Sequence, residues 1–402
     1  MSERHEVIIV GGGLVGASLA IALDRLGTRV ALVEATPAGA VPAVFDQRNL
    51  SLASATVNAL AALGVMQKLH APGGLIRRIH VSRQGDFGRT RLEAADYGRE
   101  AFGQVVVARG FGEALEARLA ELRQLTRYRP ARFIGFGGAD GGLRSIRIAD
   151  DSGEREISAR LVVAADGTRS GVREALGIAA VEHDYRQTLF VARMRSARAP
   201  DGTAYERFGE HGPTALLPRG DRHFGVVHGV ARDEAGAVAA LDDAAWMTRI
   251  QGVFGWRVGR FLATGERSMY PIVKVVAERT IAARAVLLGN AAQTIHPIGA
   301  QGFNLGLRDA LTLAELIEQA PDPGAADLLQ AYALRREEDR RRTLEFSDGL
   351  ARITSNQTPL LRPLRSLGLI AADRSPALQS LLVGGAMGFR GDVPALCREA
   401  AP

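Results

Sequence analysis

The chain begins with apolar runs and glycine turns in an order that predicts a strand, a helix and a second strand. Residues 7–10 form a short branched run, which is typical of a buried parallel strand. The pattern then predicts a helix through about residue 26, an end at Gly27 and a strand over residues 29–33. We therefore expect an α/β fold built around a parallel sheet.

The stretch that follows this unit mixes helical and alternating patterns. A helix is predicted to end near Leu63, where Gly64 provides a stop. Residues 78–108 alternate like antiparallel strands around a polar hairpin at residues 85–88. An amphipathic helix is then predicted over residues 111–125.

The middle of the chain alternates apolar and polar positions. Residues 131–165 predict a meander that closes in a buried strand, with turns at residues 137–138, 141–142 and 151–153. Residues 181–275 predict a mostly one-faced antiparallel sheet, interrupted by one clear helix over residues 244–254. Such a sheet, inserted between other pieces, is a natural place for a substrate cavity.

The C-terminal part predicts helices of two kinds. Residues 335–342 predict a solvated helix face with the ion pairs Glu337–Arg341 and Glu338–Arg342. Residues 359–390 predict strongly apolar helices. Two interpretations of these helices stay open: packing against the rest of the protein, or a surface that faces a membrane or a partner.

Composition and charge exclude several classes of protein. The 402 residues are 47% hydrophobic, enough for a sizeable core, and the one cysteine, Cys397, excludes an internal disulfide framework. The net charge is +6, and almost all of the positively charged residues are arginine. This bias indicates either an arginine-rich genome or attraction to anionic lipid. Aromatic residues make up only 5% of the chain, which argues against a nucleic-acid-binding protein. No apolar stretch reaches the roughly 20 residues of a membrane span, so we expect a cytoplasmic protein, at most peripheral on the inner face of the cytoplasmic membrane.

The first glycine turn has the spacing of a dinucleotide site. Gly11, Gly13 and Gly16 form a Gly-x-Gly-x-x-Gly turn between the first strand and helix. Glu34 ends the second strand, near the roughly 20-residue spacing of an acid that binds ribose hydroxyls. In this setting we favour a Rossmann-like site over glycines that serve packing alone. The acid favours a free ribose, as in FAD or NAD.

A second glycine-rich loop follows a buried strand over residues 286–288. The loop contains Gly289, Pro297, Gly299 and Gly302, and the pattern predicts a helix from near Phe303 through Leu313. Such a loop directs free N–H groups and the positive end of a helix dipole at one spot. Because it lacks a P-loop lysine, we expect it to face the N1/C2=O edge of a reduced flavin, which is negatively charged.

Three charged residues are further candidates, each with a structural alternative. Arg48 is placed to reach a pyrophosphate or to pair with Asp46. Arg109 is placed to contact a flavin ribityl chain or phosphate, or to pair with Glu113. Asp166 ends a buried strand and is either a helix cap or part of a third nucleotide-facing loop.

These motifs together resemble a known family. The glycine turn, Glu34, the Asp166-Gly167 loop and the closing glycine stretch resemble the FAD-dependent aromatic hydroxylases of the para-hydroxybenzoate hydroxylase type. Residues 289–309, GNAAQTIHPIGAQGFNLGLRD, are similar to the ubiquinone-biosynthesis hydroxylases, especially the 2-polyprenyl-6-methoxyphenol hydroxylase branch. The resemblance covers roughly residues 5–345.

Two positions depart from the family pattern. At the position of Asn290 the superfamily usually has an aspartate, but the named branch carries an asparagine there. That side chain can accept from a ribityl hydroxyl and donate without adding charge. The branch usually reads Ala-Gly where this chain has Gly299-Ala300, which moves one flexible position.

The resemblance implies a cofactor site and a catalytic chemistry. The implied FAD-binding residues are Gly11, Gly13, Leu14, Val15, Gly16, Glu34, Arg48, Arg109, Asp166, Asn290, Pro297, Gly299, Gln301, Gly302, Phe303 and Asn304. NAD(P)H would act as a transient reductant, and O2 would add at flavin C4a to give a hydroperoxide that hydroxylates a polyprenyl phenol. His296 and Pro297 are the catalytic candidates near the flavin, and a loop-fixing hydrogen bond is the alternative for His296.

The resemblance also implies a fold with interleaved domains. A Rossmann-like FAD-binding domain is expected from residues 1–77, 109–180 and 276–345, and a mostly antiparallel substrate domain from residues 78–108 and 181–275, with C-terminal apolar helices over 346–402. The implied partners are a ubiquinone-biosynthesis complex and, through residues 359–390, a membrane surface.

Other functions use the same cofactor parts. A flavin dehydrogenase or prenyl reductase would consume no O2 in proportion to product. A non-catalytic flavin-binding subunit would show no substrate-stimulated oxidation of NAD(P)H. A flavin halogenase is disfavoured because Trp246 and Trp256 do not form a Trp-x-Trp-x-Ile-Pro pattern.

Overall fold

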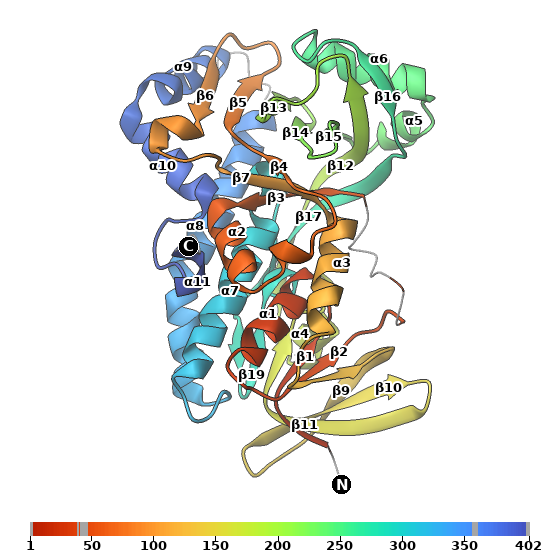
Figure 1. Ribbon diagram of the computed structural model, residues 1–402, viewed down its shortest axis with the longest axis vertical. Coiled ribbons are helices and arrows are strands. Elements are labelled where there is room, and N and C mark those ends of the chain that lie inside the picture. The colour runs from red at the N-terminus through yellow and green to blue at the C-terminus, as the bar shows by residue number, and fades with distance from the viewer. Residues whose placement is uncertain (1–2, 38–39, 41–46, 356–360, 399–402) are drawn as a thin grey trace.

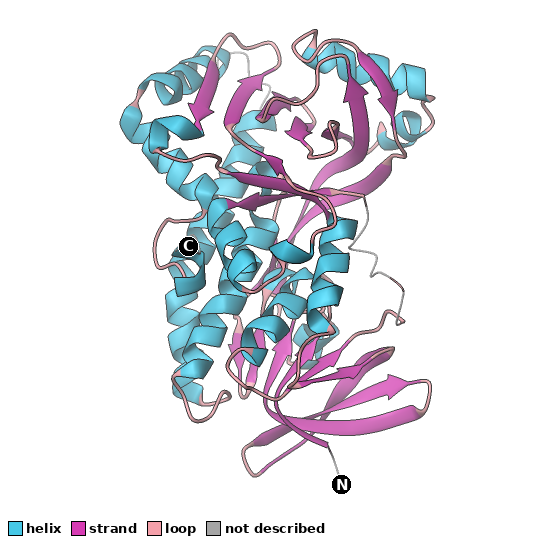
Figure 2. Cartoon of the chain, viewed as in Figure 1, coloured by secondary structure: helices cyan, strands magenta, loops and turns pink. Residues whose placement is uncertain are grey.

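The computed structural model describes residues 3–37, 40, 47–355 and 361–398, and it contains three sheets (Figures 1 and 2). Sheet A consists of β1 (Glu3–Val10), β2 (Val30–Val33), β8 (Leu125–Tyr128), β9 (Ala131–Asp140), β10 (Leu143–Asp150), β11 (Gly153–Ala164), β18 (Ile281–Ala282) and β19 (Ala285–Leu287). Its order is β18-β19-β11-β1-β2-β8, and β10 pairs with both β11 and β9. Strands β19, β11, β1, β2 and β8 are parallel, as expected.

The other two sheets are mostly antiparallel. Sheet C consists of β5 (Arg78–Arg83), β6 (Arg89–Glu93), β12 (Ala180–Ser196), β13 (Thr203–Gly209), β14 (Gly212–Pro218), β15 (Phe224–Ala231), β16 (Phe261–Thr264), β17 (Ser268–Ala277) and β20 (Gln293–Thr294). Its order is β20-β17-β12-β15-β14-β13-β5-β6, and only the β13–β5 pair among these described strands is parallel. Sheet B consists of β3 (Asn49–Ala53), β7 (Gly103–Val107) and β4 (Gly74–Leu75).

Helices surround these sheets. They are α1 (Leu14–Asp24), α2 (Ser54–Ala62), α3 (Ala108–Leu119), α4 (Gly171–Ala175), α5 (Ala235–Ala239), α6 (Asp243–Phe254), α7 (Gln301–Glu318), α8 (Ala326–Ser355), α9 (Leu361–Arg374), α10 (Pro376–Met387) and α11 (Ala395–Arg398). Short 3-10 turns are η1 (Met66–Lys68), η2 (Ala94–Tyr97), η3 (Gly289–Ala291) and η4 (Ile298–Ala300). Helix α8 extends from beside sheet A to sheet C (Figure 1).

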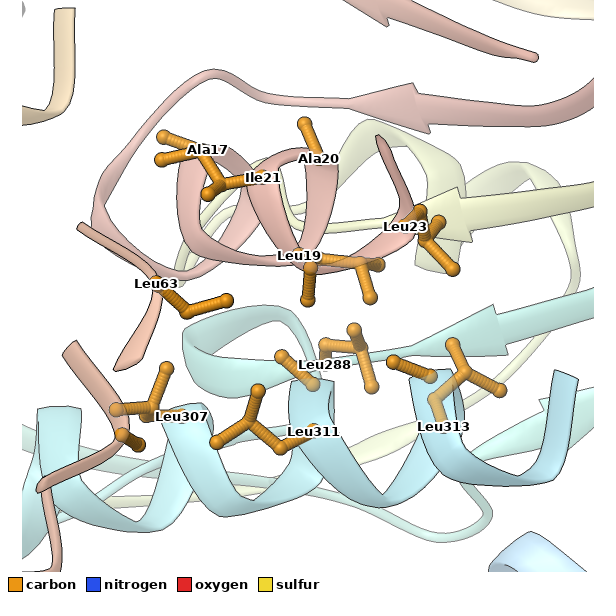
Figure 3. Close-up of a cluster of buried hydrophobic side chains, with 14 of the residues drawn as sticks. Ala17, Leu19, Ala20, Ile21, Leu23, Leu63, Leu288, Leu307, Leu311 and Leu313 are labelled. Carbon is orange, nitrogen blue, oxygen red and sulfur yellow. The ribbon is translucent and has the colours of Figure 1, made fainter. Parts of the chain in front are cut away.

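Both faces of sheet A are buried, which explains the uninterrupted apolar run of β1. Val7 and Ile9 point into a cluster formed with α1, α3 and α7, and Ile8 and Val10 point into a second cluster under β9 and β10. Helix α1 is apolar on all sides and buried over Gly16–Leu23 because it lies between the sheet and α7. Figure 3 shows the leucines of α1 and α7 facing one another in this core.

The fold class predicted from the sequence is confirmed, with local corrections. The helix predicted over residues 111–125 ends at Leu119, because residues 125–128 form β8 beside β2. The prediction of a turn at residues 137–138 was wrong. These glycines lie inside β9, at an irregularity where the register of the pairing with β10 shifts. Two short elements between residues 181 and 275, α5 and β16, were not predicted.

The segment over residues 78–108 contributes to two sheets. β5 and β6 belong to sheet C, whereas β7 pairs with β3 and β4 in sheet B. The division of the chain into six domain pieces stays a proposal. Within the described ranges, no helix combines the length and the apolar character needed to cross a bilayer.

The helix face over residues 335–342 is only partly solvated. The Glu338–Arg342 pair is confirmed, but Arg341 pairs with Glu338 and Glu345 rather than with Glu337. Arg336 is only 2% exposed, because α8 packs this side against α7. A charged run in the sequence therefore contains one fully buried cation.

Candidate active site

One cavity of about 1290 Å³ joins sheet A to sheet C. The loops after β1, β11 and β19 line one end of it, through residues 13–15, 165, 167–168 and 290. These strands are neighbours in register, with Val10 opposite Ala164 and Ala164 opposite Leu287. The carboxyl ends of adjacent parallel strands form the usual ligand crevice of an open α/β sheet. The separate glycine loops therefore meet at one cavity.

The loops approach one another too closely for side chains at two glycines. A Cβ on Gly289, which has φ +53°, would lie 2.9 Å from Cγ2 of Val15. A Cβ on Gly306, in the second turn of α7, would lie 2.8 Å from the same methyl carbon. The N-terminal turns of α1 and α7 are thus held together around Val15. This close cradle of backbone fits the extended shape of a dinucleotide cofactor.

Glu34 braces the first glycine turn. Its Oε2 accepts a hydrogen bond from the amide of Gly12 at 2.7 Å, and its Oε1 accepts from the amide of Thr36 at 2.7 Å. A carboxylate has about four acceptor positions, so these two bonds leave room for ribose hydroxyls. The predicted ribose contact stays a prediction, and the structure adds a bracing role.

The loop before α7 presents backbone amides to the cavity. Residues 297 and 299–304 line it, and the first amides of a helix lack partners within the helix. Asn304 fixes this loop: its Nδ2 donates to the carbonyls of Ser51 and Ala300, and its Oδ1 accepts from the amide of Ala53. Gln301 donates to the carbonyl of Gly299 at 3.0 Å. Asn290 is exposed and lines the same cavity.

Ala300, at the position where the family usually has glycine, is left-handed with φ 52° and ψ 37°. We expect Ala300→Gly to raise the free energy of unfolding by about 0.5–1 kcal/mol, because the left-handed region costs an L-residue about 1–2 kcal/mol. Urea unfolding measures the change. Ala244→Gly, in the exposed first turn of α6, should instead destabilise, by up to about 1 kcal/mol. A loss of stability in both variants would contradict the strain at Ala300.

The charged candidates are placed differently from one another. Arg48 lines the cavity with its guanidinium 4.3 Å from the ring centre of Tyr270, and its predicted partner Asp46 lies outside the described residues. Arg109 is exposed in the first turn of α3, away from the cavity lining in the described part of the chain. Arg48 therefore lies where a cofactor contact is expected. Arg109 lies outside the cavity, so its predicted contact with the cofactor stays a prediction.

Asp166 is directed at α4 rather than into the cavity. Its carboxylate accepts from Oγ of Ser170 at 2.5 Å and from the amide of Val172 at 3.1 Å. Burial raises its pKa above the ordinary value, although these hydrogen bonds act in the opposite direction. The neighbours Gly167 and Thr168 line the cavity. These contacts favour the helix-cap alternative for the Asp166 side chain, with its loop facing the cavity.

His296 is buried behind the loop, with 1% of its surface exposed. Its Nδ1 accepts from the amide of Ile298 at 3.2 Å, so the proton is on Nε2, which donates to Gln187 Oε1 at 3.1 Å. Burial lowers its pKa to about 4, so the ring is neutral at pH 7. These contacts favour the loop-fixing alternative, while Pro297 faces the cavity.

Sequence reasoning missed two parts of the cavity. Phe346 and Leu350 of α8 form part of its wall, which no local pattern reveals. Glu206 of β13 also lines it, between Ala204 and Phe208 on the same strand face. A carboxylate between two apolar residues at a period of two was the signal that could have found it.

Comparisons with known proteins agree with this geometry. A family described as FAD binding domain matches residues 4–347. The ubiquinone hydroxylase UbiL of Rhodospirillum rubrum is 33% identical over 388 residues, which cover 95% of this chain and 89% of that protein. The 3-demethoxyubiquinol 3-hydroxylase of Escherichia coli is 29% identical over 403 residues, which cover 96% and 100%.

The fold also matches a solved structure. The p-nitrophenol 4-monooxygenase PnpA of Pseudomonas putida superposes with a TM-score of 0.79 at 18% identity, over 97% of this chain and 99% of that one. At this identity the match shows the fold alone. With the family match over most of the chain, the cofactor is FAD. The chain therefore belongs to the FAD-binding domain family, as an FAD-dependent aromatic monooxygenase related to the ubiquinone hydroxylases.

Proposed function

We propose that the protein hydroxylates the ring of a polyprenylated phenol in ubiquinone biosynthesis, and that it most resembles the 2-polyprenyl-6-methoxyphenol hydroxylases. The observation that carries the proposal is the continuity of the cavity. It extends from the glycine loops to an apolar chamber on sheet C that includes Val81, Leu189, Val191 and Val227. A phenol ring and an isoprenoid tail both suit such walls.

The residues of this chain would provide binding and placement. Gly11, Gly13 and Gly16 would line the pyrophosphate, with Leu14 and Val15 beside them, and Glu34 would bind the adenosine ribose. The chemistry that bound FAD supplies is electron transfer from NAD(P)H to O2. The amides over residues 299–304 would face the isoalloxazine ring and stabilise its negative charge when it is reduced. The apolar chamber would exclude water from the reacting ring.

The mouth of the cavity is suited to the prenyl tail. Leu334 and Phe346 of α8 line the cavity and are 61% and 43% exposed. Leu364 and Leu367 of α9 are 63% and 57% exposed. We propose that this surface receives the tail and contacts a membrane that holds the substrate; residues 359–360 of the predicted contact segment lie outside the described residues. Flotation with anionic lipid vesicles tests it: failure to bind would remove the membrane contact and leave the hydroxylase proposal intact.

Two variants test the cofactor contacts. We expect Glu34→Ala and Asn290→Ala each to weaken FAD binding by about tenfold or more, because each removes hydrogen bonds worth roughly 1–1.5 kcal/mol or more. Flavin fluorescence after ultrafiltration measures the release. Glu337→Ala, at an exposed position of α8, is the matched control. Retention equal to wild type in both variants would remove those two assignments.

Turnover tests the function itself. The FAD-loaded protein should consume NAD(P)H and O2 in equal amounts with a short-chain prenylphenol, and label from ¹⁸O2 should enter the product ring. Reduction of the substrate without O2 consumption would instead identify a dehydrogenase or prenyl reductase. Binding of the phenol without stimulated NAD(P)H oxidation would identify a non-catalytic subunit.

A further inference from the structure

We propose that Glu206 is a catalytic residue: its carboxylate accepts the hydrogen bond of the substrate's phenolic hydroxyl and takes up that proton during ring hydroxylation. The inference rests on the proposed phenol substrate and adds a specific base to it. The observations that carry it are the register of sheet C, the apolar cavity and the absence of a partner for this carboxylate among the described residues.

The strand register places Glu206 alone in an apolar row. Across sheet C, Glu206 lies opposite Val81 of β5 and Ala215 of β14. The row continues through Val227 of β15 to Val191 of β12. All five residues line the cavity. A single carboxylate therefore interrupts an apolar wall, where an unpaired polar group is costly unless a ligand satisfies it.

Nothing in the described part of the chain hydrogen-bonds the Glu206 carboxylate. Its side chain is partly buried and lines the cavity. Phe208, two residues along the same face, packs with Ile298 of the loop before α7. The carboxylate thus lies on the wall next to the loop that is proposed to hold the flavin ring, which is where the reacting phenol must be.

The other charged groups around β13 are directed elsewhere. Strand β14 carries no titratable residue. On β5, Arg78 and His80 lie in register with Thr203 and Tyr205, so they are on the face of the sheet opposite to Glu206. Arg207, the next residue of β13, is on that opposite face as well.

Charged side chains on the cavity side of β13 are already paired. Arg83 of β5 pairs with Asp86, and Glu338 of α8 pairs with Arg342. Asp348 of α8 pairs with Lys274. Arg83, Glu338 and Asp348 are therefore held by partners other than Glu206.

Burial raises the pKa of Glu206 to about 7 from an ordinary 4.5. A base works best when its pKa lies near the working pH, so this environment suits proton abstraction. The raised value also has a stability consequence: the folded state favours the protonated form, so stability relative to an uncharged glutamine should fall as pH rises from about 4.5 through about 7. A melting curve records this without turnover.

The proposed step is a balanced proton transfer. The phenolic O–H bond breaks, a new O–H bond forms on Glu206, and the electron pair stays on the phenol oxygen and spreads into the ring. The enriched ring carbon receives one oxygen atom of O2 and gives up its hydrogen as a proton, which passes to the phenol oxygen as the aromatic ring is restored. The second oxygen atom leaves as water: NAD(P)H, through bound FAD, would supply the two electrons for its reduction together with one proton, and the proton held by Glu206 and one proton from solvent complete the balance.

Glu206→Gln keeps the shape of the side chain and removes the base. With the FAD-loaded enzyme and a prenylphenol, wild-type kcat should rise with pH through about 7. Glu206→Gln should lower kcat by about 100-fold or more, with a smaller change in KM, and should lose this pH dependence. Glu206→Asp should restore part of kcat and the pH dependence.

Stability and surface controls complete the test. Glu206→Gln should melt higher than wild type at pH 8 and equally at pH 4.5, which also shows that it folds. Glu182→Gln, at an exposed position of β12, should leave kcat and its pH profile unchanged. A wild-type kcat and pH profile in Glu206→Gln would overturn the role of Glu206 while leaving the proposed function intact. Failure of the wild-type protein to hydroxylate any phenol would overturn both.

Discussion

Arg336→Met should lower the free energy of unfolding by about 3–5 kcal/mol, the usual cost of breaking a buried ion pair by removing one partner. Arg336 lies between α7 and α8, with its Nε 2.7 Å from Oδ1 of Asp309 and its Nη2 2.5 Å from Oδ2 of Asp339. Burial works against ionisation of Asp339, yet Arg308 and Arg336 hold its pKa below the ordinary value. Methionine would leave the buried Asp309 without its hydrogen-bonded cation.

Urea unfolding at pH 7 measures this loss. Arg341→Met is the matched control: Arg341 is on the same helix and pairs with Glu338 and Glu345, but its side chain is 53% exposed. Surface pairs contribute about 0–1 kcal/mol, so similar losses in the two variants would refute the buried network.

Gly16→Ala should weaken FAD binding by about 100-fold or more. A Cβ at Gly16 would lie 2.0 Å from the carbonyl oxygen of Gly11 and 3.1 Å from Cβ of Ala165. The helix must therefore move away from the strand, which displaces the amides that we propose face the pyrophosphate. Overpacking of this kind also costs about 1–3 kcal/mol of stability.

Flavin content after purification and a titration of the apoprotein with FAD measure this effect. Gly110→Ala is the control, because a Cβ there, in α3, meets no atom within 4 Å among the described residues. It should keep full flavin and gain a few tenths of a kcal/mol or more in helix stability. Full flavin content in Gly16→Ala would show that the turn tolerates a side chain.

Local patterns were sufficient where the partners are near in sequence. The unit β1–α1–β2 was predicted because the branched run, the glycine spacing and Glu34 all lie within one segment. The start of α7 was predicted within two residues for the same reason, although the helix continues to Glu318, five residues beyond the predicted end at Leu313. The family assignment followed from these segments.

The errors have long-range causes. α3 ends early because residues 125–128 are recruited by β2, which only the folded sheet determines. Arg336 is buried where α8 packs against α7, and it pairs there with Asp309 of α7. Its charged neighbours in the sequence therefore wrongly predicted a solvated position. Asp166 has the spacing of either a cap or a ligand, and only the orientation of its carboxylate favours the cap. The position of Glu206 in the cavity wall follows only from the register of five neighbouring strands, which the sequence does not reveal.

The order of strands in sheet A has a consequence for how the protein is made. The crevice is complete only when the ends of β1, β11 and β19 lie side by side and α7 has closed over them, and these segments are separated by more than half of the chain. A nascent polypeptide emerging from the ribosome therefore exposes the apolar β1 and α1 long before their final neighbours are synthesised. Contacts of such large sequence separation form slowly. Flavin capture must therefore come late, once translation has passed residue 318 and α7 can close the crevice.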